Sequence, residues 1–276
     1  MSKADEIFIA NIADILANGV SDNDLEVRPH WADGSHAHTI KKFALVNRYN
    51  LAEEFPIITI RRTYFKTAVD EMLWIWQKKS NKIKELNSKI WDNWADENGS
   101  IGKAYGYQLG QKSIYPEGEF DQVDKMLYDL KHNPASRRII ANMYTHKDLH
   151  QMRLYPCAYS FTLNVTGDKL NGLLNQRSQD MAVANNWNVV QYAALLHMFA
   201  ASAGLKVGEL VHVIADAHIY DRHIPTLKKM LDNPVYDAPK FVLNDKVTDF
   251  YKFSVNDFKL IDYKYNDIDD KFEVAI

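Results

Sequence analysis

The feature that most constrains this chain is a predicted strand hairpin with a long apolar helix directly behind it. The run Tyr159–Val165 has strand character, Thr166-Gly167-Asp168 supplies turn residues, and the run Leu170–Gln176 returns antiparallel to the first. A helical pattern then begins near Asn186 and ends at Gly204, and it is apolar on most of its circumference. We expect the rest of the chain to be organised around this compact unit.

The hairpin also brings reactive groups together. Cys157 is the only cysteine of the chain and stands directly after Pro156, just before the first run. The second run delivers Arg177, Ser178 and Asp180 at one end. A candidate nucleophile, an anion-binding group and a carboxylate therefore come from one small unit.

Length and composition limit the possible classes. A chain of 276 residues, 46% hydrophobic and 25% charged, is within reach of one large α/β domain. A net charge of −3 gives no basic field that would favour nucleic acid. A single cysteine excludes an internal disulfide and fits a reducing cytoplasm. The N-terminus has the pattern of an amphipathic helix, and no run approaches the ~18 apolar residues of a membrane span.

Periodic patterns predict the other elements. Strands are expected at Phe43–Asn47, Ile57–Arg61, Ile139–Tyr144 and Leu210–Tyr220, and helices at residues 4–18, Thr67–Gln77 and Asp121–Leu130. Asp216, His218 and Tyr220 share one face of the last strand, opposite its apolar side. The spacing of His212, His218 and His223 fits no zinc pattern, so we expect no metal site.

Several polar residues allow two interpretations. Glu71 lies next to the apolar stripe of its helix. It is either a partly exposed residue at the edge of that stripe or a carboxyl in a low-dielectric pocket with a raised pKa, and the pattern favours the partly exposed residue. Trp91 and Trp94 are core residues by default, although they could also contact a flat heterocycle. Asn188, on an apolar helix, is either satisfied by backbone groups or directed at a ligand.

Three arginines also allow more than one interpretation. Arg28, taken alone, is typical of a solvated surface residue. Arg137 and Arg138 either begin a solvated strand or bind phosphate through their guanidinium groups. Arginines near Cys157 would lower the pKa of its thiol, and an amide such as Asn188 suits the edge of a pyrimidine. The combination indicates nucleotide chemistry more than proteolysis, although a Cys–His hydrolase using His218 is an alternative.

Ten spaced motifs, in order, resemble one family, the folate-dependent thymidylate synthases with a catalytic cysteine. They are Arg28, Glu71 in DEMLW, Trp91 and Trp94 in IWDNWADENG, Tyr105 in AYG, Ser136-Arg137-Arg138, Pro156-Cys157, QRSQD at Gln176–Asp180, Trp187-Asn188, the D-x-H-x-Y of Asp216, His218 and Tyr220, and the terminal VAI. The resemblance covers most of the chain, roughly from residue 28 to residue 276.

The resemblance implies an α/β (α+β) fold in a single catalytic domain, residues 1–276. A mixed sheet would be packed by helices, and one sheet face would form a homodimer interface. The implied activity is reductive methylation of dUMP to dTMP with 5,10-methylenetetrahydrofolate, which yields dihydrofolate. It further implies a cytoplasmic enzyme with no metal, no membrane and no required nucleic acid.

The resemblance also implies residue roles. The implied catalytic residues are Cys157, Glu71, Arg177, Asn188, Tyr105 and Asp180. The implied dUMP-binding residues are Arg28, Arg137, Arg138, Arg177, Ser178, Asp180, Asn188, His218 and Tyr220, with Arg137 and Arg138 contributed by the other subunit. The implied folate-binding residues are Trp91, Trp94, Asp180, Trp187, Val274 and Ala275.

Some positions depart from the family pattern. Ala158 follows the cysteine where many members have histidine, and residues 183–188 replace the common LGLPFN. Ile214-Ala215 stands where a glycine pair is usual. A dUMP hydroxymethylase on the same fold is therefore the alternative enzyme, and a catalytically inactive nucleotide-binding relative is the alternative from another class. Asn188 itself favours a uracil over a cytosine nucleotide.

Overall fold

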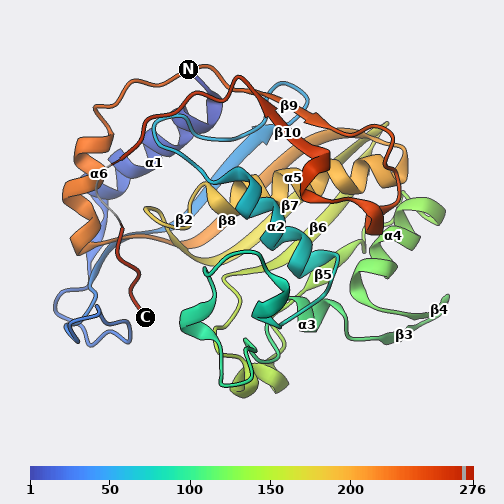
Figure 1. Ribbon diagram of the computed structural model, residues 1–276, viewed down its shortest axis with the longest axis horizontal. Helices are drawn as coiled ribbons and strands as arrows, with labels where there is room; N and C mark the ends of the chain where they lie inside the picture. Colours follow the sequence, from blue (N-terminus) through green and yellow to red (C-terminus); the bar gives the residue numbers. More distant parts are fainter. Residues whose placement is uncertain (269–271) are drawn as a thin grey trace.

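A six-stranded mixed sheet is the centre of the fold (Figure 1). The computed structural model describes residues 1–268 and 272–276. The sheet has the order β1-β2-β8-β7-β6-β5, and all neighbours are antiparallel except β7 and β8, which are parallel. Its strands are β1 (Val20–Ser21), β2 (Thr39–Asn50), β5 (Ile140–Asn142), β6 (Ala158–Thr166), β7 (Lys169–Asp180) and β8 (Lys206–Tyr220). The expected mixed sheet is confirmed.

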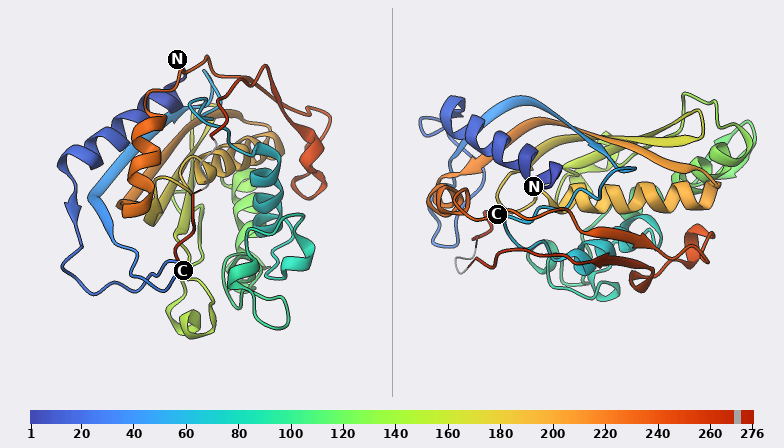
Figure 2. Two further views of the ribbon diagram at one scale, coloured as in Figure 1. Left: turned by 60° about the vertical axis from the view of Figure 1, so that its left-hand side comes forward. Right: turned by 90° about the horizontal axis from the view of Figure 1, so that it is seen from above.

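Helices and two small hairpins complete the fold. The helices are α1 (Lys3–Asn18), α2 (Phe65–Trp76), α3 (Gly106–Leu109), α4 (Gln122–His132), α5 (Trp187–Ala203) and α6 (Ile224–Met230). The small antiparallel pairs are β3 (Ser113–Tyr115) with β4 (Gly118–Phe120), and β9 (Lys240–Leu243) with β10 (Phe258–Ile261). Figure 2 shows α1, α2 and α5 on one side of the sheet. Within the described residues, no helix is long and apolar enough to cross a membrane.

The predicted hairpin and its helix lie at the centre. Strands β6 and β7 pair antiparallel through a turn at Gly167, whose φ of 62° suits glycine. Helix α5 ends at Gly204, which has φ 67° and caps the helix in the left-handed region. Residues such as Val190, Leu195 and Phe199 are fully buried, and α5 packs against α2 and the sheet. This packing fixes the end of β7 and the start of α5 next to each other.

The strand expected at Ile57–Arg61 does not form. The segment is buried, but side chains take its backbone donors in place of a neighbouring strand. Asp5 Oδ1 accepts from the N–H groups of Thr59 at 2.8 Å and Ile60 at 3.0 Å, and Asn186 Oδ1 accepts from that of Ile58 at 3.1 Å. The β-branched composition therefore reflects core burial and not sheet pairing.

Candidate active site

One cavity of about 780 Å³ is lined by most of the residues that were expected to form the site. It is lined by every residue expected to be catalytic, nucleotide-binding or folate-binding except Arg137 and Arg138. Those two arginines are exposed and lie outside the cavity, in the segment that precedes β5. Arg28, which alone suggested a surface residue, is exposed and also lines the cavity. Elements far apart in the sequence thus converge on one space.

Cys157 stands immediately before β6, opposite Arg177 on β7. The Arg177 backbone N–H donates to the Cys157 carbonyl at 2.9 Å, and Arg177 Nη2 lies 3.6 Å from Cys157 Sγ. Nε and Nη2 of Arg177 also donate to the carbonyls of Pro156 at 3.1 Å and Tyr155 at 2.8 Å, which holds the guanidinium in place. Burial raises the pKa of the Cys157 thiol, while the charges of Arg177 and Arg28 lower it.

Tyr105 supports the cysteine from the side of α3. Its hydroxyl oxygen accepts from the Cys157 backbone N–H at 3.1 Å. Tyr105 is the residue directly before α3. Its φ of 46° is unusual for a residue other than glycine. Its ring packs edge-on against Trp91 at 5.3 Å. A buried aromatic contact thus helps to place the hydroxyl group under the cysteine backbone.

Glu71 is a buried carboxylate, so the interpretation as a partly exposed flank is wrong. It is 6% exposed and accepts three hydrogen bonds. Trp91 Nε1 donates to Oε1 at 2.7 Å, and Trp187 Nε1 and Gln191 Nε2 donate to Oε2 at 2.5 and 2.7 Å. Burial raises the pKa of Glu71 and these neutral donors oppose the rise. Trp91 is both a core residue and a hydrogen-bond donor at the site.

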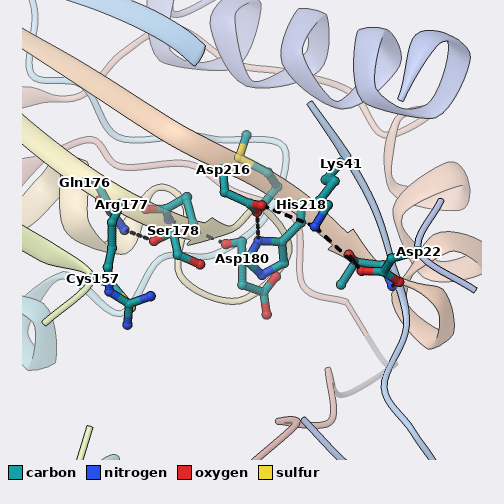
Figure 3. A network of polar contacts seen from close by, with 12 residues as sticks. Asp22, Lys41, Cys157, Gln176, Arg177, Ser178, Asp180, Asp216 and His218 are labelled. Atoms are coloured by element: carbon teal, nitrogen blue, oxygen red, sulfur yellow. Dashed lines mark hydrogen bonds and ion pairs between the residues drawn. The ribbon is translucent and has the colours of Figure 1, made fainter. Parts of the chain in front are cut away.

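A charged network lies at the other end of the cavity (Figure 3). His218 Nδ1 lies 2.8 Å from Asp216 Oδ1, and Lys41 Nζ lies 3.6 Å from Asp216 and 3.9 Å from Asp22. Asp22 also accepts two hydrogen bonds from Thr39, each at 2.6 Å. Asp22 and Lys41 are site residues that the sequence patterns did not predict. Lys41 lies just before the predicted strand Phe43–Asn47, whereas no pattern near Asp22 predicts its place in the site.

Asp180 and the C-terminal residues shape the remaining wall. Asp180 Oδ1 accepts from the backbone N–H groups of Ala182 at 2.8 Å and Val183 at 3.1 Å, which fixes the turn after β7. The terminal Ile276 pairs with His30 through two backbone hydrogen bonds of 2.8 and 3.0 Å. Val274 and Ala275 line the cavity beside this pairing. The C-terminal residues are thus docked against the segment that contains His30.

Within residues 1–268 and 272–276, no cluster of three or more His, Cys, Asp or Glu side chains could hold a metal ion. The groups that do converge are a thiol, guanidinium groups, amides and the buried carboxylates of Glu71 and Asp22. Together they define an enzyme site built for covalent catalysis on an anionic substrate with a polar ring edge.

Comparisons with known proteins identify the family. Residues 6–276 match the family described as thymidylate synthase. The chain is 44% identical to a thymidylate synthase of Bacillus phage phi3T and 43% identical to thymidylate synthase 1 of Bacillus subtilis strain 168, over the full length of each pair. A solved structure of thermostable thymidylate synthase A from Bacillus subtilis matches with a TM-score of 0.94 at 42% identity, covering 99% of both chains. The chain belongs to the thymidylate synthase family.

Proposed function

We propose that the chain converts dUMP to dTMP with 5,10-methylenetetrahydrofolate, releasing dihydrofolate, and that Cys157 is the covalent nucleophile. Family membership favours this methyl transfer over the alternative of a dUMP hydroxymethylase. The observation that most supports the mechanism is the placement of the Cys157 thiol 3.6 Å from Arg177 in the cavity that Glu71 and Asn188 also line. A pure nucleotide-binding protein has no need of this thiol.

In this mechanism Cys157 Sγ adds to C6 of the uracil ring, and the electron pair moves toward C5. C5 then forms a bond to the methylene carbon of the folate. Loss of the C5 proton and of tetrahydrofolate leaves an exocyclic methylene group, which hydride from the folate reduces. Release of Cys157 restores the ring. Glu71 organises water for the proton transfers, for which a carboxyl of raised pKa is suited.

The remaining roles are those that the family resemblance implies, and they are supported by the placement of these side chains in one cavity. Arg28, Arg177 and Ser178 hold the phosphate, and His218 and Tyr220 hold the deoxyribose hydroxyl. Asn188 reads the uracil edge, and Tyr105 holds the backbone of Cys157. The folate contacts are Trp91, Trp94, Asp180, Trp187, Val274 and Ala275. Closure of the docked C-terminal residues excludes water.

The active form proposed here is a cytoplasmic homodimer in which residues 1–276 act as one catalytic domain. Arg137 and Arg138 lie outside the cavity of their own chain, which supports their contribution to the phosphate site of the other subunit. Strand β2 leaves Phe43 85% exposed and Val46 58% exposed, which suits an interface on the sheet face.

A turnover assay tests the function directly. Incubation with dUMP and 5,10-methylenetetrahydrofolate should give dTMP and dihydrofolate in equal amounts, identified by mass and by absorbance. Hydroxymethyl-dUMP with tetrahydrofolate would assign the enzyme to the hydroxymethylase alternative. Binding of dUMP without any product would favour a regulatory protein. Cys157→Ala should abolish turnover, and normal turnover by this variant would refute the mechanism.

A further inference from the structure

Five polar side chains form one continuous row of hydrogen bonds from Glu71 to His212. Gln191 Nε2 donates to Glu71 Oε2 at 2.7 Å, and Asn188 Nδ2 donates to Gln191 Oε1 at 3.1 Å. Gln176 Nε2 donates to Asn188 Oδ1 at 3.2 Å, and His212 Nε2 lies 2.8 Å from Gln176 Oε1. Asn188 is the middle member and lines the cavity. The row links a strand-embedded histidine to the buried carboxylate through three amides.

Two backbone carbonyls fix the direction of the row. Gln191 Nε2 also donates to the Ala68 carbonyl at 3.3 Å, and Gln176 Nε2 donates to the Ser178 carbonyl at 3.0 Å (Figure 3). A carbonyl oxygen can only accept, so the NH2 ends of both glutamines must point as they do. The oxygen of Gln176 therefore faces His212, and the Nε2 of His212 must bear the proton.

The state of His212 agrees with this assignment. The side chain is fully buried, and burial lowers its pKa to about 3, so the imidazole is neutral and has a single ring proton. Its Nδ1 has no hydrogen-bond partner among the described residues. The one N–H of His212 is therefore on the nitrogen that faces Gln176.

The row leaves Asn188 with one unused N–H and one unused lone pair. The uracil edge offers the complementary pair, a donor at N3 and an acceptor at O4, whereas the cytosine edge offers an acceptor at N3 and a donor at N4. To suit cytosine, the Asn188 amide would have to turn over. Its NH2 would then face the NH2 of Gln176 and its oxygen the oxygen of Gln191, with two hydrogen bonds lost in a poorly solvated site.

We propose that Gln191 and His212 are positioning residues that set the preference for uracil over cytosine, because each holds one end of the row that fixes the Asn188 amide. This inference rests on the proposed function. It adds that Asn188, which faces the pyrimidine, cannot distinguish uracil from cytosine unless its neighbours fix the orientation of its amide. Gln191 also couples the recognition of the ring to the carboxylate that handles protons, because the same amide contacts both Glu71 and Asn188.

The test compares dissociation constants for dUMP and dCMP by titration calorimetry. We expect Gln191→Met and His212→Phe each to lower the ratio of dCMP to dUMP dissociation constants by about 2- to 12-fold, since each variant removes roughly one hydrogen bond from the groups that hold the Asn188 amide. His212→Gln, which can still donate an N–H to Gln176, should retain the wild-type ratio. A purely structural role would weaken both nucleotides by the same factor and leave the ratio unchanged.

Gln179→Met is the matched control. Gln179 is 1% exposed and lies on β7, but it is not part of the row. An unchanged ratio in both Gln191→Met and His212→Phe would overturn the inference, as would an equal fall in Gln179→Met. If one row variant fails to fold, the variant at the other end still decides the outcome. Wild-type production of dTMP with unchanged ratios would refute only the inference, whereas absence of dTMP would refute the proposed function.

Discussion

Removal of the Arg177 charge should raise the pKa of the only cysteine. Arg177 Nη2 lies 3.6 Å from Cys157 Sγ. At this separation a unit charge stabilises a thiolate by about 1 kcal/mol at the dielectric of water and by about 5 kcal/mol at an effective dielectric of about 20. One pKa unit corresponds to about 1.4 kcal/mol. Because the pair is only partly buried, we expect Arg177→Gln to raise the pKa of Cys157 by about 1 to 2 units.

The assay is the pH dependence of alkylation by iodoacetamide, which reacts with the thiolate. Cys157 is the only cysteine, so every alkylated molecule reports on this group. The midpoint should move upward by the same 1 to 2 units, and the rate below the midpoint should fall by roughly 10- to 100-fold. Arg177→Lys keeps the charge but loses the two-pronged contact with the Tyr155 and Pro156 carbonyls, so its midpoint should move less.

Arg48→Gln provides the control. Arg48 is an exposed arginine of β2 whose Nε donates to Glu209 at 2.9 Å, and it does not line the cavity. Its removal should leave the midpoint unchanged. An unchanged midpoint in Arg177→Gln would show that Arg177 does not stabilise the thiolate, and the electrostatic account of the nucleophile would be wrong.

Four further changes test other parts of the structure. Glu71→Gln should retain dUMP binding but lower kcat by about 10²- to 10⁴-fold, and wild-type kcat should fall as the pH drops through the raised pKa of Glu71. Deletion of Ile276 removes its two hydrogen bonds to His30, so kcat should fall while the far-UV circular dichroism stays unchanged. Gly172→Ala would place a Cβ 2.7 Å from Phe161 Cζ, and urea titration should show a loss of about 1 to 3 kcal/mol in the free energy of unfolding. If the proposed homodimer forms through the exposed face of β2, Val46→Glu should yield monomers in sedimentation velocity and lose turnover, because the proposed contribution of Arg137 and Arg138 to the other subunit's site would be removed.

Local sequence patterns were sufficient to predict the central hairpin of β6 and β7 and the helix α5. Their periodicities are clear, and Gly167 and Gly204 mark the turn and the helix end. The segment Ile57–Arg61 shows the limit of such patterns. Its strand-like composition is real, but whether a buried segment joins a sheet depends on which partners reach its backbone. Those partners are Asp5 and Asn186, about 50 and 130 residues away along the chain.

The site residues were predictable as residue types, but the environments of several were not. Glu71 was placed on the correct helix, yet its burial depends on donors from Trp91, Trp187 and Gln191, which lie 20, 116 and 120 residues further along the chain. No periodicity within α2 reports such contacts. Lys41 was missed for a similar reason, since only the pairing of β2 with β8 brings it to Asp216.

The two groups central to the proposed chemistry are stabilised in different ways, and this difference has a functional consequence. Burial raises the pKa of both Cys157 and Glu71. Cys157 is compensated by the positive charges of Arg177 and Arg28, which favour the thiolate directly. Glu71 is compensated only by neutral N–H donors, from two indoles and one amide. The pKa of Glu71 stays raised and no positive charge favours its ionised form, which suits this carboxyl to proton transfer. The charges of Arg177 and Arg28 meanwhile limit the rise in the pKa of the Cys157 thiol without reversing it, so one cavity holds a nucleophile that charged partners favour in its ionised form and a carboxyl that has no such partner.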